Sequence, residues 1–363
     1  MSSVELFFEG NYDEERSVIT HAKIRRALRD ASNPMDLDEN IFIQNFRLSK
    51  QAFLDVLTDI DDKLKPIKSQ QSIPNILKLA AVLKFFAQGS YQLSVGNDFN
   101  IGMAQPTVSV ILSELLSILE RHICPKGIQF NYTQEEERRA KIYFFEKSRI
   151  PNVVGAIDGT HIKIIGPNKD LQHVYYNRKG YYSINAMLVC DHLMYIRCVN
   201  AKHPGSSHDA SVWNMSQLKV KLEASYRKGR TNFRILGDGG YPLSPYLITP
   251  YRNVEESSLQ ANFNKKHAHG RNIIERTIGV LKCRFRCLLQ ARELHYPAKK
   301  ATKIFNVCAA LHNICVKYRL ENPEAIEEES ENVLGNHDML DDSAMFTEGS
   351  RIRDSIARFM QTE

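Results

Sequence analysis

The fold class follows from the segment Pro151-Asn-Val-Val-Gly-Ala-Ile-Asp-Gly-Thr-His-Ile-Lys-Ile164, because the residue pattern changes there from helical to strand-like. Residues 152–157 are almost all apolar, which is typical of a strand buried on both faces in the middle of a sheet. Residues 161–164 alternate between polar and apolar side chains and predict a segment with one face in water. Asp158 and Gly159 separate the two segments, and an Asp-Gly pair is a strong turn signal.

The sequence that follows predicts more strands and then helices. Strand-like segments cover residues 182–190 and 193–199, and a short buried strand covers residues 233–236. Residues 209–226 have the apolar spacing of a helix, and helices follow from Arg271 onward. Strands followed by alternating helices and strands indicate a mixed sheet with helices packed on it. The fold class expected for residues 151–320 is therefore α/β.

The preceding part, residues 41–150, has an all-helical pattern, with apolar residues at spacings of three and four. A break at residue 89 and a turn at residues 101–102 lead into a helix over residues 106–119. This is a helix-turn-helix spacing, in which Gln105 and Thr107 are candidates to contact DNA. An ordinary helical bundle has the same apolar stripe, and it is the preferred interpretation unless the next domain also acts on DNA.

Charge is distributed unevenly along the chain. Residues 321–363 carry 12 acidic and 3 basic residues, so residues 1–320 have a net charge of +15 although the whole chain has +6. Basic residues are densest over residues 263–303, where 11 lysines and arginines accompany two glutamates. Such a stretch can neutralise phosphates, which makes nucleic acid the first partner to consider. A solvated helix face with a solubilising tail explains the composition equally well.

Composition also excludes several classes of protein. Apolar residues make up 43% and charged residues 25%, which is ordinary globular usage and excludes a wholly disordered or fibrous chain. No stretch resembles a membrane span or a signal peptide, so we expect a protein that stays inside the cell and has no membrane partner. The seven cysteines include no Cys-x-x-Cys pair, which disfavours a zinc ribbon or a disulfide framework.

We therefore expect four parts. They are an N-terminal segment (residues 1–40), a helical domain (41–150), an α/β domain (151–320) and an acidic, largely disordered tail (321–363). Within the tail, residues 351–359 have the pattern of a short terminal helix.

Carboxylates are placed where a catalytic site could form. Asp158 ends the first buried strand and Asp238 ends the strand at 233–236, and a carboxylate at the edge of an apolar core needs a cation or hydrogen-bond donors. Each aspartate alone is more simply explained as turn chemistry. Glu275 lies beside the apolar stripe of the helix predicted over residues 271–288, where an exposed ion pair with Arg271 is the plainer explanation.

Together, four motifs resemble those of a known family. They are Gly155-Ala-Ile-Asp158-Gly-Thr-His161, His203-Pro-Gly-Ser-Ser-His208-Asp209, Leu236-Gly-Asp238-Gly-Gly-Tyr241-Pro242 and Ile274-Glu275-Arg276-Thr-Ile-Gly279-Val-Leu-Lys282. From about residue 41 to residue 320 the chain resembles the PIF/Harbinger transposase-derived nucleases. Their DDE superfamily endonuclease domain has an RNase H-like fold, a mixed sheet flanked by helices.

The resemblance implies a site and a metal. It implies that Asp158, Asp238 and Glu275 form a catalytic acidic triad that binds a divalent cation, Mg²⁺ or Mn²⁺, and that Asp209 is a further metal-site acid. Helix capping is the alternative role for Asp209. Two carboxylates about 4 Å apart repel by roughly 4 kcal/mol at an effective dielectric near 20, so an ionised cluster needs such a cation. Lys282 and Arg286 are our own candidates to hold the DNA strand.

Three functions remain open from the sequence. The first is metal-dependent hydrolysis of DNA phosphodiester bonds by the Asp/Asp/Glu site. The second is a catalytically silent DNA-binding or adaptor protein that keeps the fold, and the third is a phosphohydrolase built on His208 and Asp209. The resemblance also implies a Myb-like DNA-binding partner and a location in nucleus and cytoplasm, although the sequence contains no clear nuclear import signal.

Overall fold

The structure is a computed structural model of the chain, and it describes residue 20 and residues 23–27, 29–65, 72–98, 101–324 and 343–361. The chain divides into two compact units, Met1–Leu119 (unit 1) and Glu120–Glu363 (unit 2). Each unit has its own buried core. The strands that the structure describes are all in unit 2.

Unit 1 is helical over its described residues. Phe42, Phe46 and Phe53 form an aromatic cluster, with ring centroids of Phe42 lying 4.7 Å from Phe46 and 5.4 Å from Phe53. The side chain of Lys84 is buried among these helices and pairs with Asp98. The elements are η1 (Pro34–Asp36), α2 (Glu39–Phe46), α3 (Lys50–Ile60), η2 (Asp61–Lys63), α4 (Asn75–Gln88), α5 (Gln92–Gly96) and α6 (Gln105–His122), whose last residues belong to unit 2.

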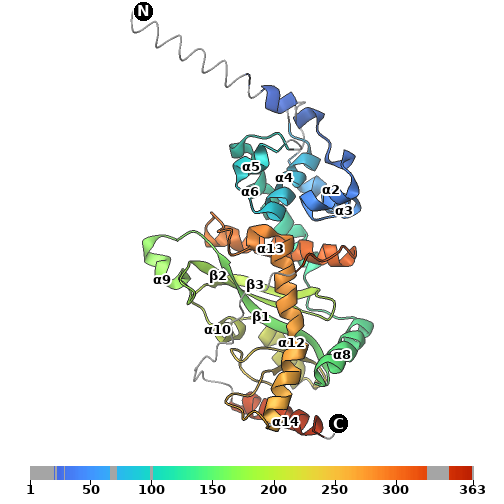
Figure 1. The fold of residues 1–363 in the computed structure, drawn as a ribbon, viewed down its shortest axis with the longest axis vertical. Helices are drawn as coiled ribbons and strands as arrows, with labels where there is room; N and C mark the ends of the chain where they lie inside the picture. The colour runs from blue at the N-terminus through green and yellow to red at the C-terminus, as the bar shows by residue number, and fades with distance from the viewer. Residues whose placement is uncertain are drawn as a thin grey trace, which may run out of the picture. The chain divides into compact units, whose positions relative to one another are not determined.

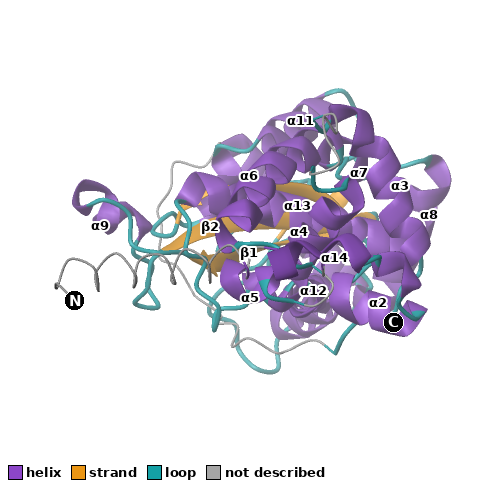
Figure 2. Ribbon diagram, turned by 90° about the horizontal axis from the view of Figure 1, so that it is seen from above, coloured by secondary structure: helices purple, strands orange, loops and turns teal. Residues whose placement is uncertain are grey.

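Unit 2 contains a five-stranded mixed sheet with the order β3-β2-β1-β4-β5 (orange in Figure 2). β1 is antiparallel to β2 and parallel to β4, and β5 is parallel to β4. The expected mixed α/β class is confirmed. The strands are β1 (Val153–Lys163), β2 (Ser183–Cys190), β3 (Ile196–Pro204), β4 (Arg234–Leu236) and β5 (Leu247–Ile248).

The strand at the start of unit 2 differs from the prediction in one respect. The two predicted segments are one continuous strand, β1, and the pair Asp158-Gly159 lies inside it opposite Leu188 and Met187 of β2. The turn interpretation of this Asp-Gly pair is therefore wrong, because the backbone continues its ladder of hydrogen bonds with β2. β5 was not predicted, since two buried residues are too short to show a period.

Helices of unit 2 pack against this sheet. Figure 1 shows α12 as one long helix, which contacts β1, β2 and β4 and lies beside α8. α13 packs on β2 and β3. The helical elements are α7 (Cys124–Gly127), α8 (Gln134–Ser148), η3 (Lys169–Leu171), α9 (Gln172–Tyr175), α10 (Asp209–Asn214), α11 (Gln217–Arg227), α12 (Leu259–Arg284), η4 (Arg286–Leu288), α13 (Ala298–Lys317) and α14 (Ser343–Phe359).

Two predicted helices have different bounds in the structure. The helix predicted over residues 209–226 is two helices, because Ser216 caps α11 by accepting a hydrogen bond from the amide of Lys219. The helix predicted over residues 271–288 begins at Leu259 and ends at Arg284. The lysines and histidines in its first turns are typical of an exposed segment. His267 is nevertheless buried, and its Nε2 lies 3.0 Å from the carbonyl oxygen of Ile248.

The predicted boundary at residue 150 does not coincide with the division of the structure. α8 packs on β1 and α12 and belongs to unit 2. Its first turn is fastened to the sheet by Arg197 of β3, whose Nη2 donates to Glu136 at 2.8 Å. The helical pattern of residues 120–150 therefore belongs to helices that cover the sheet. Helical periodicity alone does not distinguish such helices from those of an independent bundle.

Near the C-terminus, α14 covers residues 343–359 and is longer than the helix predicted for residues 351–359. It packs on β5 and α12, and Arg353 lies over the ring of Tyr251 with its guanidinium carbon 3.9 Å from the ring centroid. Within the predicted disordered tail, residues 325–342 lie outside the described residues, whereas residues 343–359 form α14. In the described ranges, no helix combines the length and the apolar character needed to cross a membrane.

Candidate active site

Asp158 and Asp238 lie beside each other because of the register of two parallel strands. Ala156 of β1 pairs with Leu236 of β4, and each aspartate follows two residues later along its own strand direction. Neighbouring strands are about 4.8 Å apart, so residues at matching positions are neighbours. The sheet thus brings together two carboxylates that are 80 positions apart in sequence.

Arg271 of α12 joins Asp158 to Glu275. Its Nη2 lies 2.7 Å from Oδ2 of Asp158, and its Nη1 lies 2.7 Å from Oε1 of Glu275. The side chains of Arg271 and Asp158 are 12% and 15% exposed, whereas that of Glu275 is 36% exposed. The ion pair of Glu275 with Arg271 that sequence reasoning took as the plain alternative is present, and the same guanidinium also holds Asp158.

Asp209 reaches the same place from the start of α10. Its Oδ1 accepts a hydrogen bond of 2.9 Å from Nδ2 of Asn185 on β2. A Cβ atom at Gly159 would lie 2.5 Å from Oδ1 of Asp209. Position 159 is therefore a glycine for reasons of space, because any side chain there would push Asp209 away. Asp209 heads α10, but no side-chain capping bond is present at that helix start.

Asp238 is held by a local turn. Its Oδ1 accepts a hydrogen bond of 3.0 Å from the amide of Gly240, and its carbonyl oxygen accepts one of 3.3 Å from the amide of Tyr241. The turn chemistry expected for this Asp-Gly pair is thus present. The turn leaves the carboxylate of Asp238 beside Asp158, so Asp238 belongs both to the turn and to the group of acids.

Burial acts on three of these acids, and repulsion by a neighbouring carboxylate acts on two of them. Burial raises the pKa of Asp158 to about 7, with Arg271 opposing the shift and the charges of Asp238 and Asp209 adding to it. The pKa of Asp209 is raised by burial and, against the hydrogen bond from Asn185, by Asp238. The pKa of Asp238 is raised by burial, which Arg271 opposes. The cluster holds more negative charge than one guanidinium offsets.

Unpaired polar atoms surround the acids. Among the described residues, the buried Tyr241 hydroxyl, Nε of Arg271 and Oδ1 of Asn185 make no hydrogen bond. Burial, followed by the charges of Asp209, Asp158 and Asp238, raises the pKa of Tyr241 well above its ordinary value. Buried polar groups without partners are rare. Their presence around a cluster of carboxylates indicates a site made to hold something polar.

We name Asp158, Asp209, Asp238 and Glu275 the acid cluster. All its donors are carboxylate oxygens, which suit Mg²⁺ or Mn²⁺. In the described part of the chain, however, no three His, Cys, Asp or Glu side chains are arranged as a metal-binding group. Arg271 bonds one oxygen of Asp158 and one of Glu275, and the amide of Gly159 bonds the other oxygen of Asp158 at 2.9 Å.

The residues predicted to contact DNA differ in their exposure to solvent. Lys282 is only 2% exposed and its Nζ lies 3.5 Å from the carbonyl oxygen of His161, so the prediction that Lys282 holds a DNA strand is wrong for this arrangement. Arg286 is exposed in η4, beyond the end of α12. In unit 1, Gln105 is exposed at the first residue of α6 and donates to Gln92 at 2.9 Å, while Thr107 is half-buried.

Sequence reasoning missed three residues of this site. Arg271 was considered only as a partner of Glu275 within one helix, and its bond to Asp158 spans 113 positions. Tyr241 stands in a quoted motif but received no role, and Asn185 stands in a strand that is buried throughout. A buried asparagine in an apolar strand was the one signal that could have been followed.

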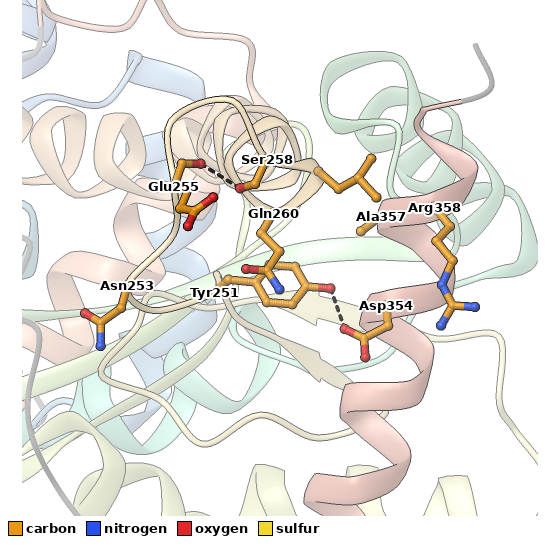
Figure 3. A pocket seen from close by; sticks show the side chains of 9 residues that line it. Tyr251, Asn253, Glu255, Ser258, Gln260, Asp354, Ala357 and Arg358 are labelled. Carbon is orange, nitrogen blue, oxygen red and sulfur yellow. Dashed lines mark hydrogen bonds between the residues drawn. The ribbon is translucent and has the colours of Figure 1, made fainter.

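A cavity of about 580 Å³ lies elsewhere in unit 2, between the start of α12 and α14 (Figure 3). The hydroxyl of Tyr251 donates to Asp354 across it at 2.6 Å, and Ser258 donates to the carbonyl oxygen of Glu255. None of the residues that line it belongs to the acid cluster. The candidate active site is therefore the acid cluster and not this cavity.

The part of the chain that contains the acid cluster matches a known family. Residues 157–313, which include all four acids, match the family described as DDE superfamily endonuclease. The protein named "Putative nuclease HARBI1" of Rattus norvegicus is 30% identical over 259 residues, or 71% of this chain and 72% of that protein. The chain belongs to the Harbinger transposase-derived nuclease family. The family predicted from the four motifs is thereby confirmed.

Other relatives extend the family. The Homo sapiens protein of the same name has the same identity and coverage. "Protein ALP1-like" of Arabidopsis thaliana is 29% identical over 296 residues, which are 77% of this chain and 71% of the plant protein. No solved structure matches the chain significantly. The mixed sheet with its covering helices is consistent with a DDE endonuclease fold.

Proposed function

We propose that the protein is a divalent-metal-dependent nuclease that hydrolyses DNA phosphodiester bonds, with Asp158, Asp238 and Glu275 as catalytic acids on an RNase H-like sheet. Asp209 is the further acid. One observation carries the proposal: within the region that matches the endonuclease family, Asp158 and Glu275 both bond the guanidinium of Arg271, whose charge also acts on Asp209 and Asp238.

A divalent cation suits the acid cluster by its donor chemistry. Asp158, Asp209, Asp238 and Glu275 would hold it, and when bound it would supply an activated water and charge for the leaving oxygen. The chain's own residues set the geometry. The parallel register of β1 and β4 holds Asp158 against Asp238, and Asn185 orients Asp209. The buried Tyr241 hydroxyl can donate to a water among the carboxylates.

DNA is the proposed substrate because the segment that carries Glu275 is rich in cations. Residues 263–303 carry 11 lysines and arginines, of which Lys282 and Arg284 are buried, whereas Lys265, Arg276 and Arg286 are exposed. Exposed cations such as Arg286 can contact the phosphates on either side of the scissile bond. A Myb-like DNA-binding partner and a location in nucleus and cytoplasm stay predictions from the family resemblance.

A second candidate is a catalytically silent DNA-binding or adaptor protein. The ion pairs of Arg271 with Asp158 and Glu275 favour it, because a cluster that a side chain partly neutralises can persist without a metal. The phosphohydrolase built on His208 and Asp209 has less support, since Asp209 belongs to the acid cluster and bonds to Asn185.

Cleavage of supercoiled plasmid DNA by the full chain, with Mg²⁺ or Mn²⁺, tests the proposal. We expect nicking that EDTA abolishes and that Asp158→Asn and Asp238→Asn each reduce by at least about a hundredfold. The control is Asp170→Asn, an exposed aspartate of η3, which should cleave like the wild type. DNA binding without metal-dependent nicking by the wild type would support the adaptor function.

A further inference from the structure

Arg271 occupies the place where a cation is expected. Each of its two terminal nitrogens bonds a carboxylate oxygen at 2.7 Å, one from Asp158 on β1 and one from Glu275 on its own helix. The guanidinium is buried, and its positive charge also acts on the carboxylates of Asp238 and Asp209. A single side chain therefore neutralises part of a cluster whose other members lie on separate elements.

The oxygens that Arg271 uses are those that a metal would need. Asp158 has one oxygen on the amide of Gly159 and the other on Arg271, so both are already accepting hydrogen bonds. Carboxylate oxygens must be available to coordinate Mg²⁺ or Mn²⁺. A guanidinium and a metal ion that share the same oxygens compete, and each weakens the binding of the other by the same factor.

The guanidinium of Arg271 does not use all of its hydrogen-bond donors. Nε of Arg271 is buried and makes no hydrogen bond within the described structure. An arginine that serves only as a structural link usually has its donors paired. A buried donor without a partner, next to the unpaired hydroxyl of Tyr241, is compatible with a side chain that moves when another cation enters.

The geometry points to Arg271 as an internal counter-ion that holds the acid cluster together without metal and that a divalent cation must displace from Asp158. This inference rests on the proposed function, because it assumes that the acid cluster binds metal. Arg271 is thus a positioning residue that sets the metal affinity. It accounts for why the acids converge here and yet present no ready metal-binding group.

The test compares full-length wild type with Arg271→Gln and Arg271→Lys. Melting temperature in EDTA measures the metal-free fold, and the electron paramagnetic resonance signal of free Mn²⁺ measures Mn²⁺ affinity. We expect Arg271→Gln to melt at a lower temperature in EDTA and to bind Mn²⁺ roughly tenfold more tightly, so that Mn²⁺ raises its melting temperature more than that of the wild type. Arg271→Lys keeps the charge but cannot bridge two carboxylates, so its affinity should lie between the two.

The matched control is Arg276→Gln, which removes an exposed arginine of the same helix. It should bind Mn²⁺ like the wild type. Equal or weaker Mn²⁺ binding by both Arg271 variants would overturn the inference and leave the nuclease proposal standing. Absence of Mn²⁺ binding from the wild type and every variant would overturn both. If Arg271→Gln does not fold, Arg271→Lys alone decides, since tighter binding supports the displacement and unchanged binding contradicts it.

Discussion

Gly159 shows how one residue without a side chain serves the site. It lies in the middle of β1, where glycine normally weakens a strand, and its missing Cβ is the space that Oδ1 of Asp209 approaches. Asp209 can then bond Asn185 and stay beside Asp158. By contrast, the nearest atom to a Cβ at Gly239 is Cγ of Pro250 at 4.0 Å, so that position has room.

Gly159→Ala should therefore harm the site while Gly239→Ala should not. The new Cβ would lie 2.5 Å from Oδ1 of Asp209, so we expect Asp209 to be displaced and the free energy of unfolding to fall by about 1–3 kcal/mol. Gly239→Ala should change it by no more than about 0.5 kcal/mol. Urea unfolding of both variants measures this, and equal stabilities would contradict the close approach of Asp209.

At the scale of elements, α12 is held to the sheet at its first turns as well as at the face that carries Arg271 and Glu275. His267 contacts the end of β5 through its bond to Ile248, and its ring lies against Phe263 with 5.9 Å between centroids. Burial lowers the pKa of His267 to about 4, against the bond to the Ile248 carbonyl and with the charges of Arg271 and Arg353 adding to the shift. The folded chain therefore keeps this imidazole neutral.

A lowered histidine pKa makes stability fall in acid. Between about pH 6.5 and pH 4 the unfolded chain binds a proton at His267 that the folded chain does not, so stability is lost as the pH falls through this window. The contribution is up to about 3 kcal/mol. His267→Gln should flatten the pH dependence of urea unfolding, whereas the control His269→Gln, on the exposed surface of α12, should leave the wild-type slope.

One side chain of α13, that of Asn313, hydrogen-bonds the backbone at the edge of β3. Oδ1 of Asn313 accepts from the amide of Ile196 at 2.8 Å, and its Nδ2 donates to the carbonyl oxygens of Ile196 and Gly127. Asn313→Leu would remove these bonds from the buried amide and carbonyl oxygen of Ile196, while the Gly127 carbonyl keeps its bond from Tyr195, and we expect the change to destabilise the protein by about 2–4 kcal/mol. Asn306→Leu, which loses a partly exposed bond to Glu120, should cost less than about 1 kcal/mol. Thermal unfolding of both variants distinguishes these outcomes.

At the scale of the whole molecule, the fold of unit 2 needs residues that precede its first strand. Arg197 pairs with buried Asp191 and with Glu136, and it donates to the carbonyl oxygen of Asn131. Tyr195 donates to Gly127 at 2.9 Å. Breaking a buried ion pair by removing one partner is costly, and here the partners come from both sides of residue 150.

Two fragments test this division. Residues 120–363 should unfold cooperatively on heating, because they keep α7, α8 and the partners of Arg197. Residues 151–363 lose these helices and expose the sheet face that α8 covers, so we expect an aggregated or non-cooperative fragment. Circular dichroism melts of both compare them directly. A cooperative transition for residues 151–363 would show that the boundary predicted from the sequence pattern is the physical one.

The strands were largely predictable because β1, β2 and β3 extend over eight or more residues with a strand-like pattern, and the short β4 lies in an apolar run. β1, β2, β3 and β4 were all expected near their observed places, and only β5 with its two residues was missed. Helix bounds were less predictable. The first turns of α12 carry basic residues and histidines, and only the packing of His267 against Ile248 shows that this segment belongs to the core.

The family, and the prediction of the four acids, came from the sequence alone, because motif order and residue type are local properties. Tertiary structure alone decided that Arg271 lies between Asp158 and Glu275, that Gly159 makes room for Asp209, and that Lys282 is buried. These facts depend on which elements pack together across more than 40 positions of chain. Sequence periodicity does not encode such contacts, because the free energies of burial and ion pairing depend on how α12 packs against the sheet.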